Sequence, residues 1–188
     1  MNNTQDFLLK CTQNFEKQFK NKDDLQFFIG NNHENCEIYI QSSKQNLEYR
    51  IGFFNQRLYI SVPIYQACYP VFRLMDNEFW LKMLEINHFA KFSFFQNVSF
   101  DEKIQNKANK IPAKSSIFEL IKVFVLSEEY QEYSVDMGDF DVEFNMEKLD
   151  NDLINDVVKA LNILYYLNKE LAKKCTPQFI SKNYLSNI

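Results

Sequence analysis

The sequence predicts an α+β fold: a mostly antiparallel sheet of about six to seven strands, with an N-terminal helix, a middle helix and a long C-terminal helix packed on it. Apolar residues recur at helical spacing at both ends of the chain and near its middle. Short segments of alternating apolar and polar residues lie between them, as half-buried strands require. A chain of 188 residues fits one domain, which we expect over 1–176 with a C-terminal tail over 177–188.

The first expected element is an amphipathic helix over residues 4–20, with Thr4 as its N-terminal cap. Its apolar residues recur every three or four positions and would face the core. These residues are Phe7, Leu8, Cys11, Phe15 and Phe19.

A strand-rich region follows the helix. Two of its strands flank Asn55-Gln56, which is the spacing of a tight hairpin although the turn lacks its favoured glycine. Pro63 and Pro70 would close this meander. The four expected strands span 24–30, 36–41, 47–54 and 57–64.

The middle of the chain predicts a helix that begins at Asp76 or Asn77 and ends near Asn87. Residues 89–100 are expected to form a strand. The polar, lysine-containing segment 101–116 is expected to form an exposed, mobile loop.

Residues 117–126 are ambiguous. Ser116 and Glu119 fit a helix capping box, whereas the β-branched residues Ile117, Ile121 and others favour a strand. We favour the strand.

The last large element is a helix across about 150–174. Asp150 and Asp152 lie in its first turn and lysines lie near its end, which complements the helix dipole. Pro177 would stop it. One face of this helix is formed by Leu153, Ile154, Val157, Val158, Leu161, Leu164, Tyr165, Asn168 and Leu171.

The stretch MGDFDVEFNMEKLDND, residues 137–152, spaces its first acids as an EF-hand would. A calcium loop needs glycine at position six and glutamate at position twelve, but Phe144 and Asp150 occupy these positions. Apolar and acidic residues alternate over 139–146, which is the period of a strand with its carboxylates on one face. We therefore expect a strand here.

The charge distribution is uneven. Residues 128–156 contain eleven acidic residues and one basic residue, Lys148, for a net charge of −10. Because the whole chain carries −4, the rest carries +6. Such asymmetry favours an interaction surface for a basic partner, and tyrosines among the acids suit an interface. The candidate partner-binding residues are Glu128, Glu129, Tyr130, Glu132, Tyr133, Asp139, Asp141 and Glu143. A merely solvated face and a metal site are the alternatives.

Several function classes lose their support. The three glycines are scattered, so no phosphate-binding glycine loop exists. The four cysteines form no Cys-x-x-Cys pair, and we interpret them as free thiols of a cytoplasmic protein. The His33–Cys36 half-site, which His88 and Cys68 could complete, is weak evidence for zinc, and we expect no metal or cofactor.

Other partners are also disfavoured. The lysines of 101–116 lack the aromatic or arginine neighbours of a nucleic-acid site. The sequence shows no signal peptide and no apolar run of about 18 residues, so we expect no membrane segment. A hydrolase elbow is missing, and with only two histidines we expect no enzyme.

The preferred hypothesis is a non-enzymatic cytoplasmic module that binds a basic protein partner, for example an immunity protein that inhibits a nuclease toxin. A homodimeric chaperone is the alternative, because the order of helices and strands is similar to that of small acidic chaperones of specialised secretion systems. An enzyme whose family the sequence does not reveal is the third hypothesis. It would require His33 or His88 to line a pocket with a carboxylate or a cysteine.

Overall fold

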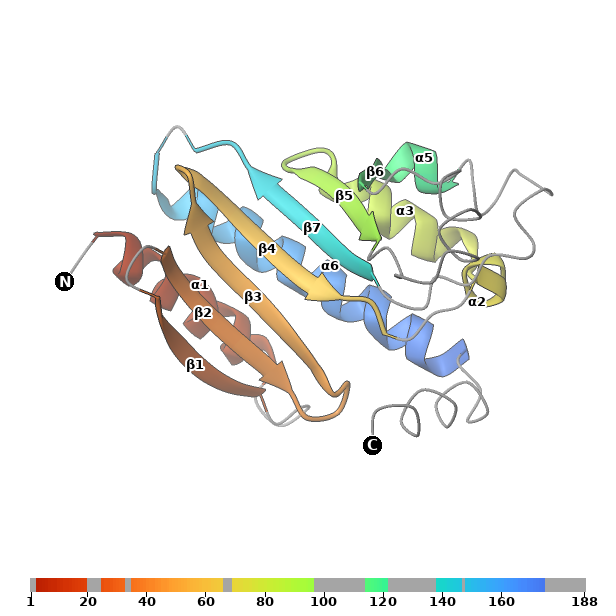
Figure 1. The fold of residues 1–188 in the computed structure, drawn as a ribbon, viewed down its shortest axis with the longest axis horizontal. Helices are drawn as coiled ribbons and strands as arrows, with labels where there is room; N and C mark the ends of the chain where they lie inside the picture. Colours follow the sequence, from red (N-terminus) through yellow and green to blue (C-terminus); the bar gives the residue numbers. More distant parts are fainter. Residues whose placement is uncertain are drawn as a thin grey trace, which may run out of the picture.

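The computed structural model describes residues 3–19, 25–32, 35–65, 69–96, 114–121, 138–146 and 148–174. Within them, strands pair in one antiparallel sheet in the order β1-β2-β3-β4-β7-β5-β6 (Figure 1). Strands β2, β3, β4, β7 and β5 form the body of the sheet, with β1 at one edge and the short β6 at the other. The predicted α+β class, antiparallel sheet and N-terminal, middle and C-terminal helices are confirmed.

The element bounds follow the predicted segments closely in the first half of the chain. The strands are β1 (Leu25–Asn32), β2 (Asn35–Ser42), β3 (Leu47–Phe54), β4 (Arg57–Pro63), β5 (Lys91–Gln96), β6 (Lys114–Ser116) and β7 (Gly138–Phe144). The helices are α1 (Asn3–Phe19), α2 (Tyr69–Arg73), α3 (Asn77–Ile86), α5 (Ile117–Ile121) and α6 (Asn151–Lys174).

The core lies between the sheet and its helices. Figure 1 shows α1 and α6 behind the sheet, so that among the described elements the side facing the viewer is left open. The apolar side chains of the alternating strands point to the helices, for example Ile60 of β4 and Val142 of β7, both fully buried. Helix α6 adds its predicted apolar face, including Leu161 and Leu164. Helix α1 buries Phe7, Leu8, Cys11 and Phe15 as expected.

An aspartate side chain caps the N-terminus of α3 and another caps the N-terminus of α6. The Phe79 amide donates to Asp76 Oδ1 at 3.0 Å, and the Leu153 amide donates to Asp150 Oδ1 at 3.0 Å. Each bond satisfies an amide that has no partner inside the helix. Both aspartates had been expected at these helix starts.

Hydrogen bonds of buried polar side chains link the sheet side of the core to α6. Gln45, in the turn between β2 and β3, is buried and donates through Nε2 to the Tyr165 carbonyl at 2.9 Å. The Tyr49 hydroxyl donates to Gln45 Oε1. Farther along α6, the buried Asn168 accepts from the Tyr65 amide through Oδ1 at 2.8 Å.

The expected hairpin of β3 and β4 is present. Asn55 and Gln56 both adopt positive φ, at 47° and 61°, which matches the twist of a two-residue hairpin turn. Phe54 therefore lies opposite Arg57, and this pairing sets the register of the whole hairpin.

Two predictions need correction. Residues 117–121 form the helix α5, so the strand favoured for 117–126 is wrong there, and residues 122–126 lie outside the described part. The expected loop 101–116 ends in the strand β6 at residues 114–116, where Ser116 pairs with Ser93. The short helix α2 was not foreseen. The rest of that loop and the tail 177–188 fall outside the described residues.

Candidate functional site

Strand β7 carries the predicted acids on the open face of the sheet. Its residues alternate between buried and half-buried, and Asp139, Asp141 and Glu143 are the half-buried set. The segment is an extended strand, as expected, and not a calcium loop. Because β7 lies between β4 and β5, its acids do not protect an exposed sheet edge, and that structural role is excluded.

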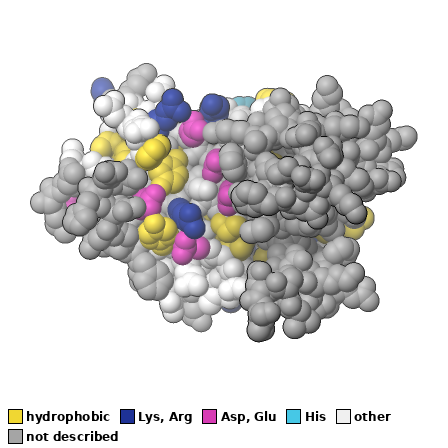
Figure 2. Space-filling view, viewed as in Figure 1, with side chains coloured by type: hydrophobic (Ala, Val, Ile, Leu, Met, Phe, Trp, Pro, Cys, Tyr) yellow, Lys and Arg dark blue, Asp and Glu magenta, His cyan; other side chains and the backbone are white. Residues whose placement is uncertain are grey.

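Basic side chains meet Glu143 from both neighbouring strands. Glu143 Oε2 lies 3.6 Å from Arg57 Nη1 of β4 and 3.9 Å from Lys91 Nζ of β5. Lys148 was the only base near these acids in the sequence, so the pairing was not anticipated. Figure 2 shows acidic and basic side chains intermingled on this face rather than segregated. The face is therefore mixed in charge, with acids on its central strand.

The remaining predicted site residues cannot be placed on this face. Glu128, Glu129, Tyr130, Glu132 and Tyr133 lie outside the described residues. The tyrosines that the structure does place beside acids come from other strands.

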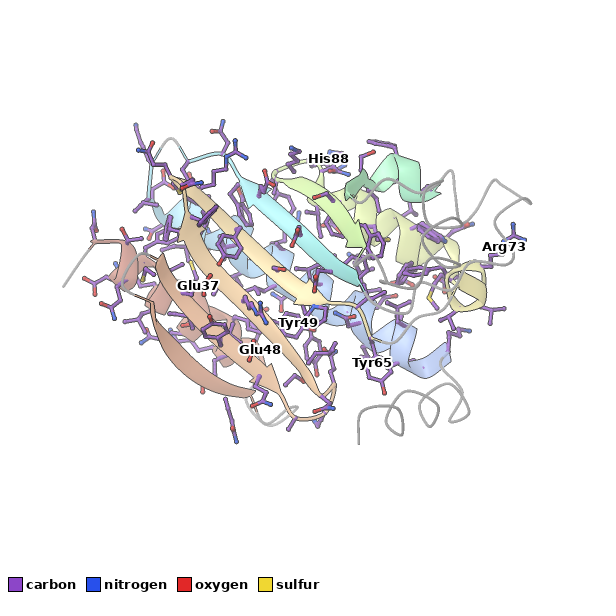
Figure 3. All side chains as sticks on the ribbon, in the orientation of Figure 1. Glu37, Glu48, Tyr49, Tyr65, Arg73 and His88 are labelled. Atoms are coloured by element: carbon purple, nitrogen blue, oxygen red, sulfur yellow. The ribbon has the colours of Figure 1, made fainter. Side chains whose placement is uncertain are left out.

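The open face also holds a carboxylate bound by two phenols, which the sequence did not reveal. Glu37 of β2 lies across from Gly52 of β3, and Gly52 lies across from Tyr59 of β4. The Tyr59 hydroxyl donates to Glu37 Oε1, and the Tyr39 hydroxyl donates to Glu37 Oε2. We call Glu37, Tyr39 and Tyr59 the Glu37 clamp (Figure 3, in which Glu37 is labelled).

Gly52 makes this contact possible because it has no side chain. A Cβ atom at this position would lie 2.7 Å from Glu37 Cγ, 3.0 Å from the Cys36 carbonyl oxygen and 3.1 Å from the Tyr59 hydroxyl. The Tyr59 side chain thus reaches across β3 to a strand that is not its neighbour. The glycine is needed here for space and not for an unusual backbone angle.

The environment keeps both phenols protonated. Burial is the main cause that raises the pKa of Tyr59, and the hydrogen bond to Glu37 is the second. For Tyr39 the hydrogen bond to Glu37 is the main cause that raises the pKa, and burial is the second. A phenol donates a hydrogen bond only in its protonated form, so the clamp stays closed across the neutral range.

Arg50 lies beside the clamp on β3. Its Nε donates to Glu48 Oε1 at 3.1 Å, and its guanidinium lies over the Tyr39 ring, 5.9 Å from the ring centroid. The face of Tyr39 therefore already accepts one guanidinium group.

A cleft of about 380 Å³ lies on the open face, and Glu37 and Tyr59 of the clamp are among the residues that line it. Three carboxylates and two guanidinium groups line it, so it carries one net negative charge. Phe54, 54 % exposed, adds an apolar side chain. The lining residues are Glu37, Arg50, Phe54, Arg57, Tyr59, Ser61, Asp141 and Glu143.

The enzyme and metal-site alternatives depend on histidine, cysteine and clustered acidic side chains. The described residues contain no group of three or more His, Cys, Asp or Glu side chains placed to hold a metal ion. His88 is exposed and does not line the cleft. Burial raises the pKa of the Cys11 thiol to about 12, which suppresses the reactive thiolate. His33 and Cys68 lie outside the described part of the chain.

Comparison with protein-family models, with curated proteins and with solved structures found no match for this chain. None of the described helices is both long enough and apolar enough to cross a membrane.

The alternating pattern of the strands contained a signal for the Glu37 clamp, which the sequence analysis did not use. Alternation over 36–41 and 57–64 assigns Glu37, Tyr39 and Tyr59 to the polar side, and the two-residue turn aligns Gly52 with Tyr59.

Proposed function

We propose that this chain is a non-enzymatic cytoplasmic protein-binding module whose open sheet face binds a basic protein partner. Its most concrete form is an immunity-type inhibitor that covers the phosphate-binding surface of a nuclease toxin. The observation that carries the proposal is the position of Asp139, Asp141 and Glu143 on a central strand, beside a cleft lined by charged and aromatic side chains.

The mixed charges support specific recognition as well as attraction. Interfaces use complementary charge patterns to accelerate association and to set the register of two partners. Among basic partners, Arg57 and Lys91 beside Glu143 would favour one that places an acid at the matching position. Tyrosine and arginine are also the residues that contribute most to binding energy at interfaces.

The chaperone alternative makes a different prediction for the surface. It calls for a homodimer with an exposed apolar groove, whereas the cleft on the described residues is mainly charged. Light scattering after size-exclusion chromatography separates the two hypotheses. A monomer that binds a basic partner favours the binding module, and a stable homodimer favours the chaperone.

Capture of partners from native lysate at two ionic strengths tests the proposal. Wild type is compared with a β7 variant carrying Asp139→Asn, Asp141→Asn and Glu143→Gln. A second protein, the helix variant, loses the same number of negative charges from exposed acids on helices. Its changes are Glu16→Gln, Glu78→Gln and Asp152→Asn.

We expect a basic protein to be captured by wild type and by the helix variant, and lost from the β7 variant. Raising the salt from about 0.1 M to about 1 M should release it, because the screening length falls from about 10 Å to about 3 Å. The purified partner must then bind with the same ranking. Equal capture of the partner by all three proteins at both salt concentrations would contradict the proposal.

A further inference from the structure

Glu37 differs from its acidic neighbours in what it contacts. Glu48 pairs with Arg50, and Glu143 pairs with Arg57 and Lys91. The two oxygens of Glu37 accept hydrogen bonds from phenols, and no Lys or Arg of the described residues lies within ion-pairing distance. This carboxylate on a cleft wall is thus held by two neutral donors, and the arginines that line the same cleft pair with other acids.

The clamp leaves Glu37 with room for another donor. An ionised carboxylate has about four acceptor positions on its two oxygens. Tyr59 occupies one position on Oε1 and Tyr39 one on Oε2. One position on each oxygen is then free, which is the number that the two parallel N–H groups of a guanidinium fork use.

We propose that the Glu37 clamp is the anchor site for one arginine side chain of the basic protein partner, an inference that rests on the function proposed above. The chain's own nearby arginines are engaged elsewhere, Arg50 with Glu48 and Arg57 with Glu143. The counter-charge for Glu37 therefore comes from the partner. Asp141 and Glu143 line the same cleft and extend the acidic path beyond the clamp.

The clamp favours arginine over lysine for two reasons. Guanidinium matches two oxygens at once, whereas an ammonium group is a point charge. The aromatic rings of the clamp also suit a planar cation, as the position of Arg50 over Tyr39 shows. Because two phenols already orient the carboxylate, the Glu37 side chain loses little conformational freedom when the arginine binds.

The test uses a single residue as probe. N-acetyl-L-argininamide is titrated into the isotope-labelled full-length chain and followed by NMR at low salt, with the lysine and citrulline analogues as comparators. Glu37→Gln keeps the size of the side chain and removes its charge. Glu16→Gln is the matched control, because Glu16 is an exposed acid on α1, which lies on the other side of the sheet from the clamp.

We expect argininamide to shift the signals of residues 37, 39, 52 and 59, with a dissociation constant on the order of millimolar. Binding should weaken by roughly tenfold or more in Glu37→Gln and stay unchanged in Glu16→Gln. Lysinamide should bind more weakly, and citrullinamide should not bind. Thermal melts of both variants show whether they are folded, so that lost binding can be distinguished from lost folding.

The outcomes separate this inference from the proposed function. Absence of binding to wild type, or equal binding to wild type and Glu37→Gln, overturns the arginine anchor. If the β7 variant still loses the basic partner in that case, the proposed function stands without the anchor. If argininamide binds at Glu37 but no basic partner depends on β7, the anchor stands and the proposed function fails.

Discussion

Replacing Gly52 by alanine should open the Glu37 clamp. In an ordinary strand this change removes backbone freedom from the unfolded chain and stabilises by about 0.5–1 kcal/mol. Here the new Cβ would lie 2.7 Å from Glu37 Cγ and 3.0 Å from the Cys36 carbonyl oxygen. The carbonyl belongs to a paired strand and cannot move far, so the Glu37 side chain must leave.

The magnitude follows from the bonds that are lost. Two hydrogen bonds to a carboxylate disappear, each worth about 1–1.5 kcal/mol after the freed groups meet water. Subtracting the backbone gain leaves a net destabilisation of about 1–2.5 kcal/mol. Urea unfolding of wild type and Gly52→Ala measures this difference, provided that the slope with denaturant stays constant.

A double-mutant cycle assigns the cause. In a Glu37→Ala background the clamp is already absent, so Gly52→Ala should show only the backbone gain and stabilise by up to about 1 kcal/mol. If Gly52→Ala is neutral or stabilising in wild type, the clamp is not held as described. An equal cost in both backgrounds would place the clash at the Cys36 carbonyl instead.

Three further changes test the account. Tyr59→Phe removes one donor to Glu37 and should cost about 1 kcal/mol by urea unfolding; no loss would show that the bond contributes nothing. Burial raises the folded pKa of Cys11 from 9.0 to about 12, so its contribution to stability is complete below pH 9 and falls as the pH rises. The stability difference between wild type and Cys11→Ala should therefore shrink by about 1.4 kcal/mol from about pH 8 to about pH 10, and a constant difference would contradict this. Asp76→Ala removes the acceptor for the Phe79 amide and should lower the melting stability by about 1 kcal/mol, whereas Asp76→Ser should restore most of it.

Much of the fold follows from local patterns in the sequence. The hairpin around Asn55 and Gln56 shows why: a two-residue turn fixes one pair of opposite residues, and alternation then assigns every other side chain to a face. The helix caps Asp76 and Asp150 are equally local. The ambiguity at 117–121 is local too, and there the helix prevails over the strand preference of β-branched residues.

The candidate site depends on contacts that local patterns do not contain. Strand β7 inserts between β4 and β5, which brings Tyr59 and Lys91 to opposite sides of Glu143. Nothing near residue 143 in the sequence indicates this placement, so the acids looked uncompensated. The clamp similarly needs three strands in register, and Gly52 at the middle position, before Tyr59 can reach Glu37.

The most direct test of the central claim, that the open face binds basic partners, is an amide-resolved NMR titration with an oligoarginine peptide. At about 0.05 M salt we predict shifts confined to the outward-facing residues of β2, β3, β4 and β7, and their loss at about 0.5 M salt. Shifts spread over α1 and α6, or shifts that persist at high salt, would contradict the claim.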